Sequence, residues 1–78
     1  MKISNAAMGH QREASVLSER EVQCLQLIAG GKTSWAIAEI LGISQHTVNA
    51  HIRNIVRKLG VATRPQAVAE AMRRGVIS

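Results

Sequence analysis

Residues 34–58, SWAIAEILGISQHTVNAHIRNIVRK, decide the fold of this 78-residue chain. A short helical pattern around Ile37 and Ala38 runs to Gly42, and a longer helical pattern follows Ser44. A glycine-centred turn lets two such helices cross closely while the second projects outward. The stretch therefore predicts a helix-turn-helix. A helix–glycine–helix pattern is weak evidence of DNA binding by itself, so the side chains on the outer face of the second helix carry the functional argument.

The longer helix, predicted over about residues 44–59, has a continuous apolar face. Ser44 has a side chain suited to an N-cap, and Ile43 and Val48 are placed as a hydrophobic staple around it. Gly60 follows as the stop signal. Aliphatic residues recur at i, i+4, i+7 and i+11, which places them in one stripe facing the core. These residues are Val48, Ile52, Ile55 and Leu59.

Polar and basic side chains lie off that stripe, on the outer face of the same helix. They are His46, Asn49, Arg53 and Arg57. An asparagine can donate and accept at one adenine edge, and an arginine can bind O6 and N7 of a guanine. Ala50, beside them, is small enough to let the backbone approach DNA. We therefore favour base reading over a merely solvated face for Asn49 and Arg53.

Contacts with the DNA backbone are expected from the helix starts and from the far end of the longer helix, because helix N-termini and hydroxyls bind phosphate. The candidates are Lys32, Thr33, Ser34, Trp35, Ser44, His46, Thr47, His51, Arg57 and Lys58. For Arg57 and Lys58 a solvated face is an equal alternative, because helix C-termini favour cations without any DNA. Burial of Trp35 between helices and a supporting role for His51 are equally open.

Three further helices are predicted around the longer one. The first follows Ser18, which forms a capping box with Glu21 and is preceded by Leu17 as half of a staple with Val22. Gly30-Gly31 ends this helix. Glu21 is also expected to form an ion pair with Arg64 or Lys58, bridging two helices.

The other two helices have equally local signals. The short helix begins at Thr33 or Ser34, and its buried side is expected to consist of Ile37, Ala38, Ile40 and Leu41. The last helix opens at Thr63, with Pro65 in its first turn and Gln66 completing a capping box. It ends at Gly75, and its apolar face consists of Ala67, Val68, Ala71 and Met72.

Four helices with short connections make one compact all-α domain, predicted over residues 17–78. Residues 1–16 have no apolar periodicity and are interpreted as a flexible tail or linker. A domain of this size buries only roughly 60% of its unfolded surface, so its stability is expected to be modest.

The charge of the chain is concentrated in its second half. Ten Lys and Arg against five Asp and Glu give a net charge of +5. Residues 1–43 hold four basic and four acidic side chains, whereas residues 44–78 hold six basic side chains and one acidic one. All of the excess therefore lies in the half that contains the longer helix, as expected for a basic face that meets a polyanion.

Composition excludes several other classes of protein. Cys24 is the only cysteine, so an internal disulfide is impossible; the residue is interpreted as a small buried hydrophobe in a cytoplasmic protein. The three histidines and Cys24 lack zinc-finger spacing, so no metal site is expected. No apolar run approaches the ~20 residues of a membrane span, and Met1–Val16 lacks the apolar block of a secretory signal. The sequence shows neither paired carboxylates nor a nucleophile–base set, so we expect no enzymatic activity, no cofactor and no small-molecule ligand.

From Leu17 to its end, the chain resembles the LuxR-type helix-turn-helix domain of bacterial transcription regulators. The resemblance rests on Leu17-Ser18-Glu19-Arg20-Glu21-Val22, Ile37-Ala38, Leu41-Gly42-Ile43-Ser44, Thr47-Val48-Asn49-Ala50-His51-Ile52, Asn54-Ile55, Lys58-Leu59-Gly60-Val61, Arg64 and Gln66-Ala67-Val68. The stretch Gly31-Lys32-Thr33-Ser34-Trp35 is similar to the quorum-sensing branch, whose full-length members carry an acyl-homoserine-lactone domain ahead of this one.

The resemblance implies a four-helix domain that binds double-stranded DNA as a dimer and regulates transcription, with RNA polymerase as a candidate partner. It implies base reading at Asn49, Ala50 and Arg53, and dimer contacts around Val68 and Met72. The family commonly has a basic residue where Asn49 stands, and a glutamate where Ala36 stands. The first departure indicates different preferred bases; the second removes a capping-box partner for Thr33.

Two alternatives stay open beside this reading. Core packing is the alternative role of Val68 and Met72, and it is the commoner fate of apolar residues at helical spacing. The chain is also suited to a protein-interaction module that antagonises a full-length LuxR-type regulator through the last helix, without useful DNA binding. The base-reading chemistry of Asn49 and Arg53 argues against that role.

Overall fold

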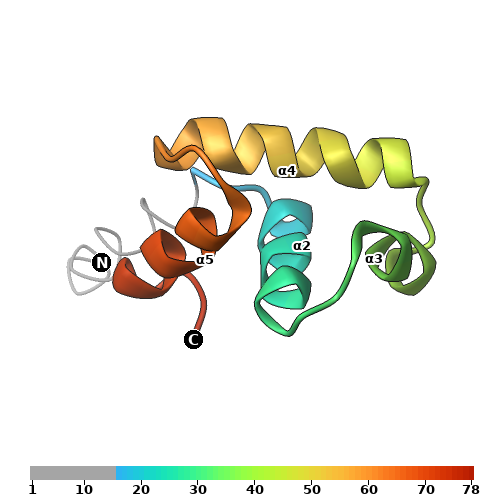
Figure 1. The fold of residues 1–78 in the computed structure, drawn as a ribbon, viewed down its shortest axis with the longest axis horizontal. Coiled ribbons are helices and arrows are strands. Elements are labelled where there is room, and N and C mark those ends of the chain that lie inside the picture. Colours follow the sequence, from blue (N-terminus) through green and yellow to red (C-terminus); the bar gives the residue numbers. More distant parts are fainter. Residues whose placement is uncertain (1–15) are drawn as a thin grey trace, which may run out of the picture.

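The structure, a computed structural model, describes residues 16–78; the predicted tail lies almost wholly outside the described residues. The described part holds α2 (Glu19–Ala29), α3 (Ser34–Leu41), α4 (Gln45–Leu59) and α5 (Arg64–Arg73). Figure 1 shows α4 along one side of the molecule, with α3 below its amino-terminal end, α5 below its carboxy-terminal end and α2 between them. The predicted all-α, four-helix architecture is confirmed.

Each helix starts where its local sequence predicts. The side chain of Ser18 accepts the N–H of Glu21 at 3.1 Å, while the Glu21 carboxylate accepts the N–H of Ser18 at 2.9 Å, closing the capping box. Thr63 and Gln66 form the second capping box. At the other two starts, Thr33 and Ser44 are single N-caps. These bonds satisfy N–H groups that have no partner inside the helix.

Glycines end α3 and α4, the two helices of the helix-turn-helix. Gly42 and Gly60 both have left-handed backbone, at φ 69° and 70°, immediately after α3 and α4. This conformation places Cβ too close to the following carbonyl in other residues, which explains why glycine stands at both positions. The turn at Gly42 is the one that sends α4 outward from α3.

The core lies where the four helices meet. The predicted stripe of α4 is confirmed, because all four of its members are buried. From α2 come Cys24 and Leu25, neither of which is exposed at all. The alanines of α5, Ala67 and Ala71, let that helix approach closely. Leu17 and Ile77, near the start and the end of the described chain, complete the buried core.

One predicted core residue is wrong. Ile40 was expected on the buried side of α3, but its side chain is 54% exposed. With 3.6 residues per turn, Ile37, Ala38 and Leu41 share an arc of about 100°, and Ile40 lies about 60° outside that arc. Apolar character alone therefore assigned Ile40 to a face that the helix geometry does not give it.

An ion pair links α2 to α4 at the edge of the core. The Lys58 Nζ lies 2.9 Å from Oε1 of Glu21, whose residue is only 4% exposed. Burial of Glu21 opposes its ionisation, but the hydrogen bonds from Lys58 and from the Ser18 N–H outweigh burial and hold the pKa of Glu21 below its ordinary value. Of the two partners expected for Glu21, the structure selects Lys58 and not Arg64.

Candidate nucleic-acid interface

The outer face of α4 presents the predicted base-reading residues to solvent. Asn49 and Arg53 are both exposed, one helical turn apart and off the buried stripe. Ala50 is half-buried beside them, so its methyl group adds no bulk above the helix surface. His46 and Arg57 extend the same exposed row toward the two ends of α4. The row is long enough to follow several base pairs of a major groove.

The starts of α3 and α4 present polar groups beside this row. The side chain of Thr33 accepts the Ala36 N–H at 3.1 Å, and that of Ser44 accepts the Thr47 N–H at 3.0 Å. The Ser44 hydroxyl in turn donates to the Thr47 hydroxyl at 3.0 Å. These hydroxyls are thus held in place by capping, while the N–H groups of the first turns remain oriented outward along the helix axis.

Asn49 belongs to a chain of side chains that sequence reasoning missed. Its Oδ1 accepts from the Ser34 hydroxyl at 3.1 Å, and the Ser34 oxygen accepts from Nη2 of Arg64 at 3.2 Å. The three residues come from α4, α3 and the start of α5, so no spacing along the sequence signals their contact. Arg64, expected only as a possible partner of Glu21, lies at this interface instead.

Burial and pairing bear on several alternatives that the sequence left open. Trp35 is 61% exposed at the start of α3 rather than buried between helices. Lys58 has its ammonium on Glu21, with a side chain only 30% exposed, which favours a structural role. His51 is half-buried on α4. Val68 is half-buried and Met72 is 48% exposed, so neither is core in the way that Ala67 is.

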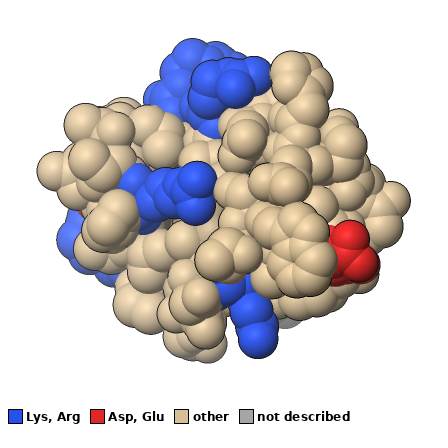
Figure 2. Space-filling view, turned by 45° about the vertical axis from the view of Figure 1, so that its right-hand side comes forward, with Lys and Arg blue, Asp and Glu red and all other residues tan. Residues whose placement is uncertain are grey.

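The positive charge of the second half is only partly available for a ligand. Arg73 and Arg74 both bind the carboxylate of Glu70, whose pKa their hydrogen bonds lower to about 2. Lys32, Arg53, Arg57 and Arg64 are the exposed cations near α3 and α4 that have no ion pair within residues 16–78. Figure 2, which brings the α3 end of the molecule forward, shows basic side chains spread over this face and an acidic one only at its edge.

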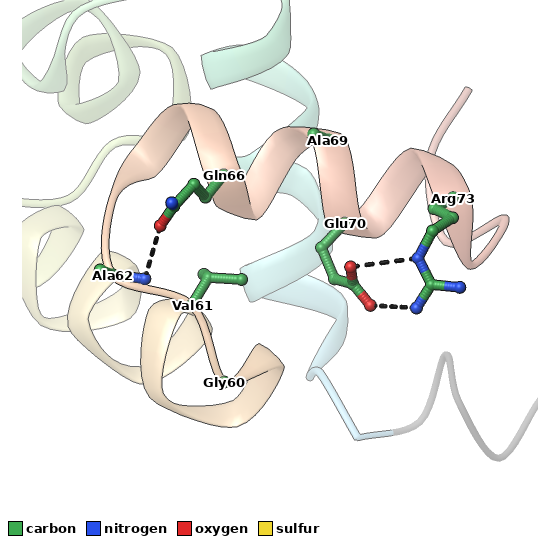
Figure 3. Close-up of a pocket in the computed structure, with 7 residues that line it drawn as sticks. All are labelled: Gly60, Val61, Ala62, Gln66, Ala69, Glu70 and Arg73. Atoms are coloured by element: carbon green, nitrogen blue, oxygen red, sulfur yellow. Dashed lines mark hydrogen bonds and ion pairs between the residues drawn. The ribbon is translucent and has the colours of Figure 1, made fainter.

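An open hollow of about 670 Å³ lies elsewhere, between the turn after α4 and one side of α5. Its lining consists of Gly60, Val61, Ala62, Gln66, Ala69, Glu70 and Arg73 (Figure 3). The polar groups in the hollow bind one another: Gln66 accepts the Ala62 N–H at 2.9 Å, and Glu70 accepts from Arg73. Because these groups are already paired, the hollow is a weaker candidate site than the exposed row of α4.

Other chemistry finds no support in the described chain. Cys24 is fully buried, and that burial raises the pKa of its thiol, which agrees with a packing role rather than a reactive one. Residues 16–78 contain no group of three or more potential metal-ligating side chains. Among their helices, none combines the length and the apolar character needed to cross a membrane.

Comparison with known proteins identifies the architecture. A family described as bacterial regulatory proteins, luxR family, matches residues 15–71. A solved structure of the transcription factor GerE superposes with a TM-score of 0.78 at 40% sequence identity, covering 81% of this chain and 94% of that one. The match therefore includes both the helix-turn-helix and the flanking helices.

Several transcription regulators are similar over most of the chain. The transcriptional activator VanR of Vibrio anguillarum is 41% identical over 78 residues, covering 97% of this chain and 32% of that protein. The quorum sensing-dependent regulator VjbR of Brucella abortus is 47% identical over 64 residues, or 82% and 25% of the two chains. The transcriptional activator LuxR of Aliivibrio fischeri is 37% identical over 68 residues, covering 87% of this chain and 27% of that protein. The chain thus spans about a quarter to a third of these relatives.

Proposed function

Because this chain belongs to the luxR family of bacterial regulatory proteins and holds the DNA-binding domain of a transcription regulator, we propose that α4 reads DNA sequence from within the major groove. Asn49, Ala50 and Arg53 face the bases in this arrangement. The starts of α3 and α4, with Lys32 and Arg57, bind the flanking phosphates. The domain is not an enzyme, since the family consists of transcription regulators.

The observation that carries this proposal is the division of α4 into two faces. One face is buried against α2, α3 and α5, while the opposite face holds exposed donors and acceptors of the kinds that match base edges. A helix held rigidly by three others can keep its outer side chains in a fixed register on DNA. The N-caps of α3 and α4 lie beside this face and supply phosphate-binding groups at the starts of the two helices.

A dimer on DNA is the second part of the proposal. Pro65, Val68, Ala69 and Met72 recur at i, i+3, i+4 and i+7 along α5, and each is exposed or half-buried. That pattern is one continuous apolar stripe, in which Val68 packs partly against the core and the other three residues are exposed. Two domains meeting through it would place their α4 helices on half-sites about one helical turn, ~10 base pairs, apart. Such a small stripe favours a dimer that forms mainly on DNA.

The similar regulators extend the proposal to the whole protein. VjbR is a quorum sensing-dependent regulator and VanR is a transcriptional activator. We therefore propose that this domain is the output unit of a quorum-sensing pathway, with DNA as its direct ligand. RNA polymerase stays a predicted partner, to which no surface of the described domain is assigned.

Selection of binding sites from a random duplex pool tests the proposal. The domain should enrich a motif with two-fold symmetry, and a single mismatch in a half-site should cost about 1–3 kcal/mol of binding free energy. Equal affinity for the selected duplex and a scrambled one would refute sequence reading by α4. Association with a full-length regulator without binding to any duplex would favour the antagonist function instead.

A further inference from the structure

The side chains of Arg64, Ser34 and Asn49 form a relay that crosses three helices. The Arg64 guanidinium donates to the Ser34 oxygen at 3.2 Å, and the Ser34 hydroxyl donates to Oδ1 of Asn49 at 3.1 Å. The sequence separates these pairs by 30 and 15 residues. Arg64 and Asn49 are exposed and Ser34 is half-buried, so the relay lies at the surface beside the outer face of α4.

The chemistry of the three groups gives the relay a direction. A guanidinium can only donate, so it must use a lone pair of the Ser34 oxygen. Ser34 then has its single proton to donate, and the amide oxygen of Asn49 is the matching acceptor. The positive charge of Arg64 polarises the hydroxyl and strengthens its donation. An Asn49 amide turned the other way would bring its N–H groups toward Ser34 and the cation, leaving the hydroxyl proton without its acceptor.

The orientation of this amide decides which base it can bind. Adenine recognition needs the amide oxygen to accept from N6 and the amide nitrogen to donate to N7. Rotation of the amide by half a turn exchanges donor and acceptor and destroys the match. No residue within 16–78 accepts from the two N–H groups of Asn49, so these remain free for a base. Asn49 thus has its amide orientation fixed through one lone pair of Oδ1, while the second lone pair of Oδ1 and both N–H groups stay available for an adenine.

We propose that Ser34 and Arg64 are positioning residues that set the base preference of Asn49 without reaching a base themselves. The inference rests on the proposed function, since it assumes that α4 lies in the major groove. It adds a specificity role to two residues of α3 and α5. A purely electrostatic role of Arg64, or a phosphate contact of Ser34, would weaken binding to all sequences alike. The relay instead predicts a change at one base position.

The test compares the base preference at the Asn49 position in the parent and in Ser34→Ala, by competition between duplexes that differ at that pair. A bidentate contact discriminates by about five- to 150-fold, and Ser34→Ala should reduce this to within about threefold of equality. Ser34→Thr, which keeps the hydroxyl, should restore the parental preference. In an Asn49→Ala background, Ser34→Ala should cause no further change in preference, because its effect passes through that amide.

Arg64→Ala and Arg57→Ala form a matched pair. Each removes one exposed cation that binds a polar side chain oxygen, but Arg57 donates to Asn54 at 3.0 Å and is not part of the relay. Both variants should weaken overall binding, whereas only Arg64→Ala should relax the preference at the Asn49 position. Relaxation of the same size in both variants, or in neither, would overturn the proposal.

A second measurement needs no DNA. The side-chain NH₂ order parameter of Asn49 should be lower in Ser34→Ala than in the parent, and should recover in Ser34→Thr. An unchanged order parameter overturns the relay whatever the DNA results. If the parent shows no base preference at any position, the proposed function fails and this inference with it. If the parent selects a motif but Ser34→Ala keeps the same preference, only the relay is overturned.

Discussion

Arg53 and Arg57 occupy the same exposed row of α4, but their surroundings differ. Nη2 of Arg57 donates to Oδ1 of Asn54 at 3.0 Å, which holds its head against the helix. The guanidinium of Arg53 makes no hydrogen bond or ion pair within the described domain and stands one turn from Asn49. A free guanidinium at mid-helix is suited to a guanine edge, and one held near the helix end is suited to a phosphate.

Arg53→Ala should therefore cost about 1–3 kcal/mol of binding free energy at the best site and relax the preference at one base position. Arg57→Ala is the control, since it removes the same charge from the same row. It should weaken all sequences nearly alike. Binding-site selection on both variants measures the difference. Retention of the parental motif by Arg53→Ala would contradict base reading by this residue.

Glu21 makes the free energy of unfolding of the domain depend on pH in the acidic range. Its folded-state pKa is lowered by Lys58 and the Ser18 N–H despite burial. A carboxylate whose pKa is lowered by folding stabilises the folded state at pH values above its ordinary pKa of about 4.3. That contribution is lost as the pH falls through the folded-state pKa. The carboxylate is ionised and paired at neutral pH, so the contribution is then fully present.

Glu21→Gln should lower the free energy of unfolding by about 1–3 kcal/mol at pH 7, because Lys58 loses its charged partner while Gln still completes the capping box. The difference from the parent should shrink below about pH 4 as Glu21 itself becomes protonated. Urea unfolding of the parent and the variant from about pH 2 to about pH 7 measures both effects. Glu19→Gln, an exposed change in the same turn, is the control and should have a smaller effect. A difference that stays constant down to the lowest pH would argue against the ion pair.

At the scale of elements, α5 carries a second apolar stripe, formed by Pro65, Val68, Ala69 and Met72, beside the alanines that face the core. Ala67 and Ala71 face the core, whereas Met72 is 48% exposed on the other apolar stripe. From the sequence alone, core packing of Met72 is the alternative to a dimer contact, and it is the commoner fate of an apolar residue at helical spacing. Because Met72 is exposed, a charged side chain at this position is not expected to unfold the helix.

Met72→Asp should abolish cooperative occupancy of two half-sites while leaving the helical circular dichroism unchanged. An aspartate on an apolar dimer contact buries an unpaired charge, which costs several kcal/mol of association free energy. Met72→Leu keeps the apolar surface and should retain cooperativity. Titration of one-site and two-site duplexes separates the effect on dimerisation from that on DNA contact. Undiminished cooperativity in Met72→Asp would place the dimer contact elsewhere.

At the scale of the whole molecule, ion pairs reduce the charge that can meet DNA. Lys58 is bound to Glu21, and Arg73 and Arg74 are bound to Glu70. The cations free of such pairs near α3 and α4 are Lys32, Arg53, Arg57 and Arg64. The excess of +5 in residues 44–78 already counts Glu70 against Arg73 and Arg74, and the pairing of Lys58 with Glu21 of the first half lowers the excess further. The charge around α4 that is available to a ligand therefore belongs to a few side chains.

Binding should nevertheless weaken steeply with salt. Three phosphates neutralised per subunit give a slope of roughly −2.7 in log affinity against log salt, or about a 40-fold loss between ~50 and ~200 mM. A dimer should lose more than about 10³-fold over the same range. Arg64→Ala should reduce the slope, whereas Arg74→Ala, which removes a paired cation, should leave it unchanged. Affinity that stays flat over this range would contradict a phosphate-bound domain.

The sequence by itself determined the helices and most of their buried faces. Their starts depend on side chains within three residues of one another, such as Ser18 with Glu21 and Thr63 with Gln66. The buried stripe of α4 depends only on helical periodicity. Such short-range interactions are written in consecutive residues, so they can be predicted without knowing how the helices pack. Ile40 is the exception, because its side chain is apolar but its angle on α3 lies outside the buried arc.

Only the tertiary structure decided which distant residues meet. The choice of Lys58 over Arg64 as the partner of Glu21 depends on how α2 crosses α4. The relay from Arg64 through Ser34 to Asn49 depends on where the starts of α3 and α5 fall beside α4. A long, flexible arginine can reach many partners, and the sequence contains several of comparable charge and polarity. Its actual partner is fixed by the few ångströms that helix packing leaves between side chains, and these distances have no periodic signal along the chain.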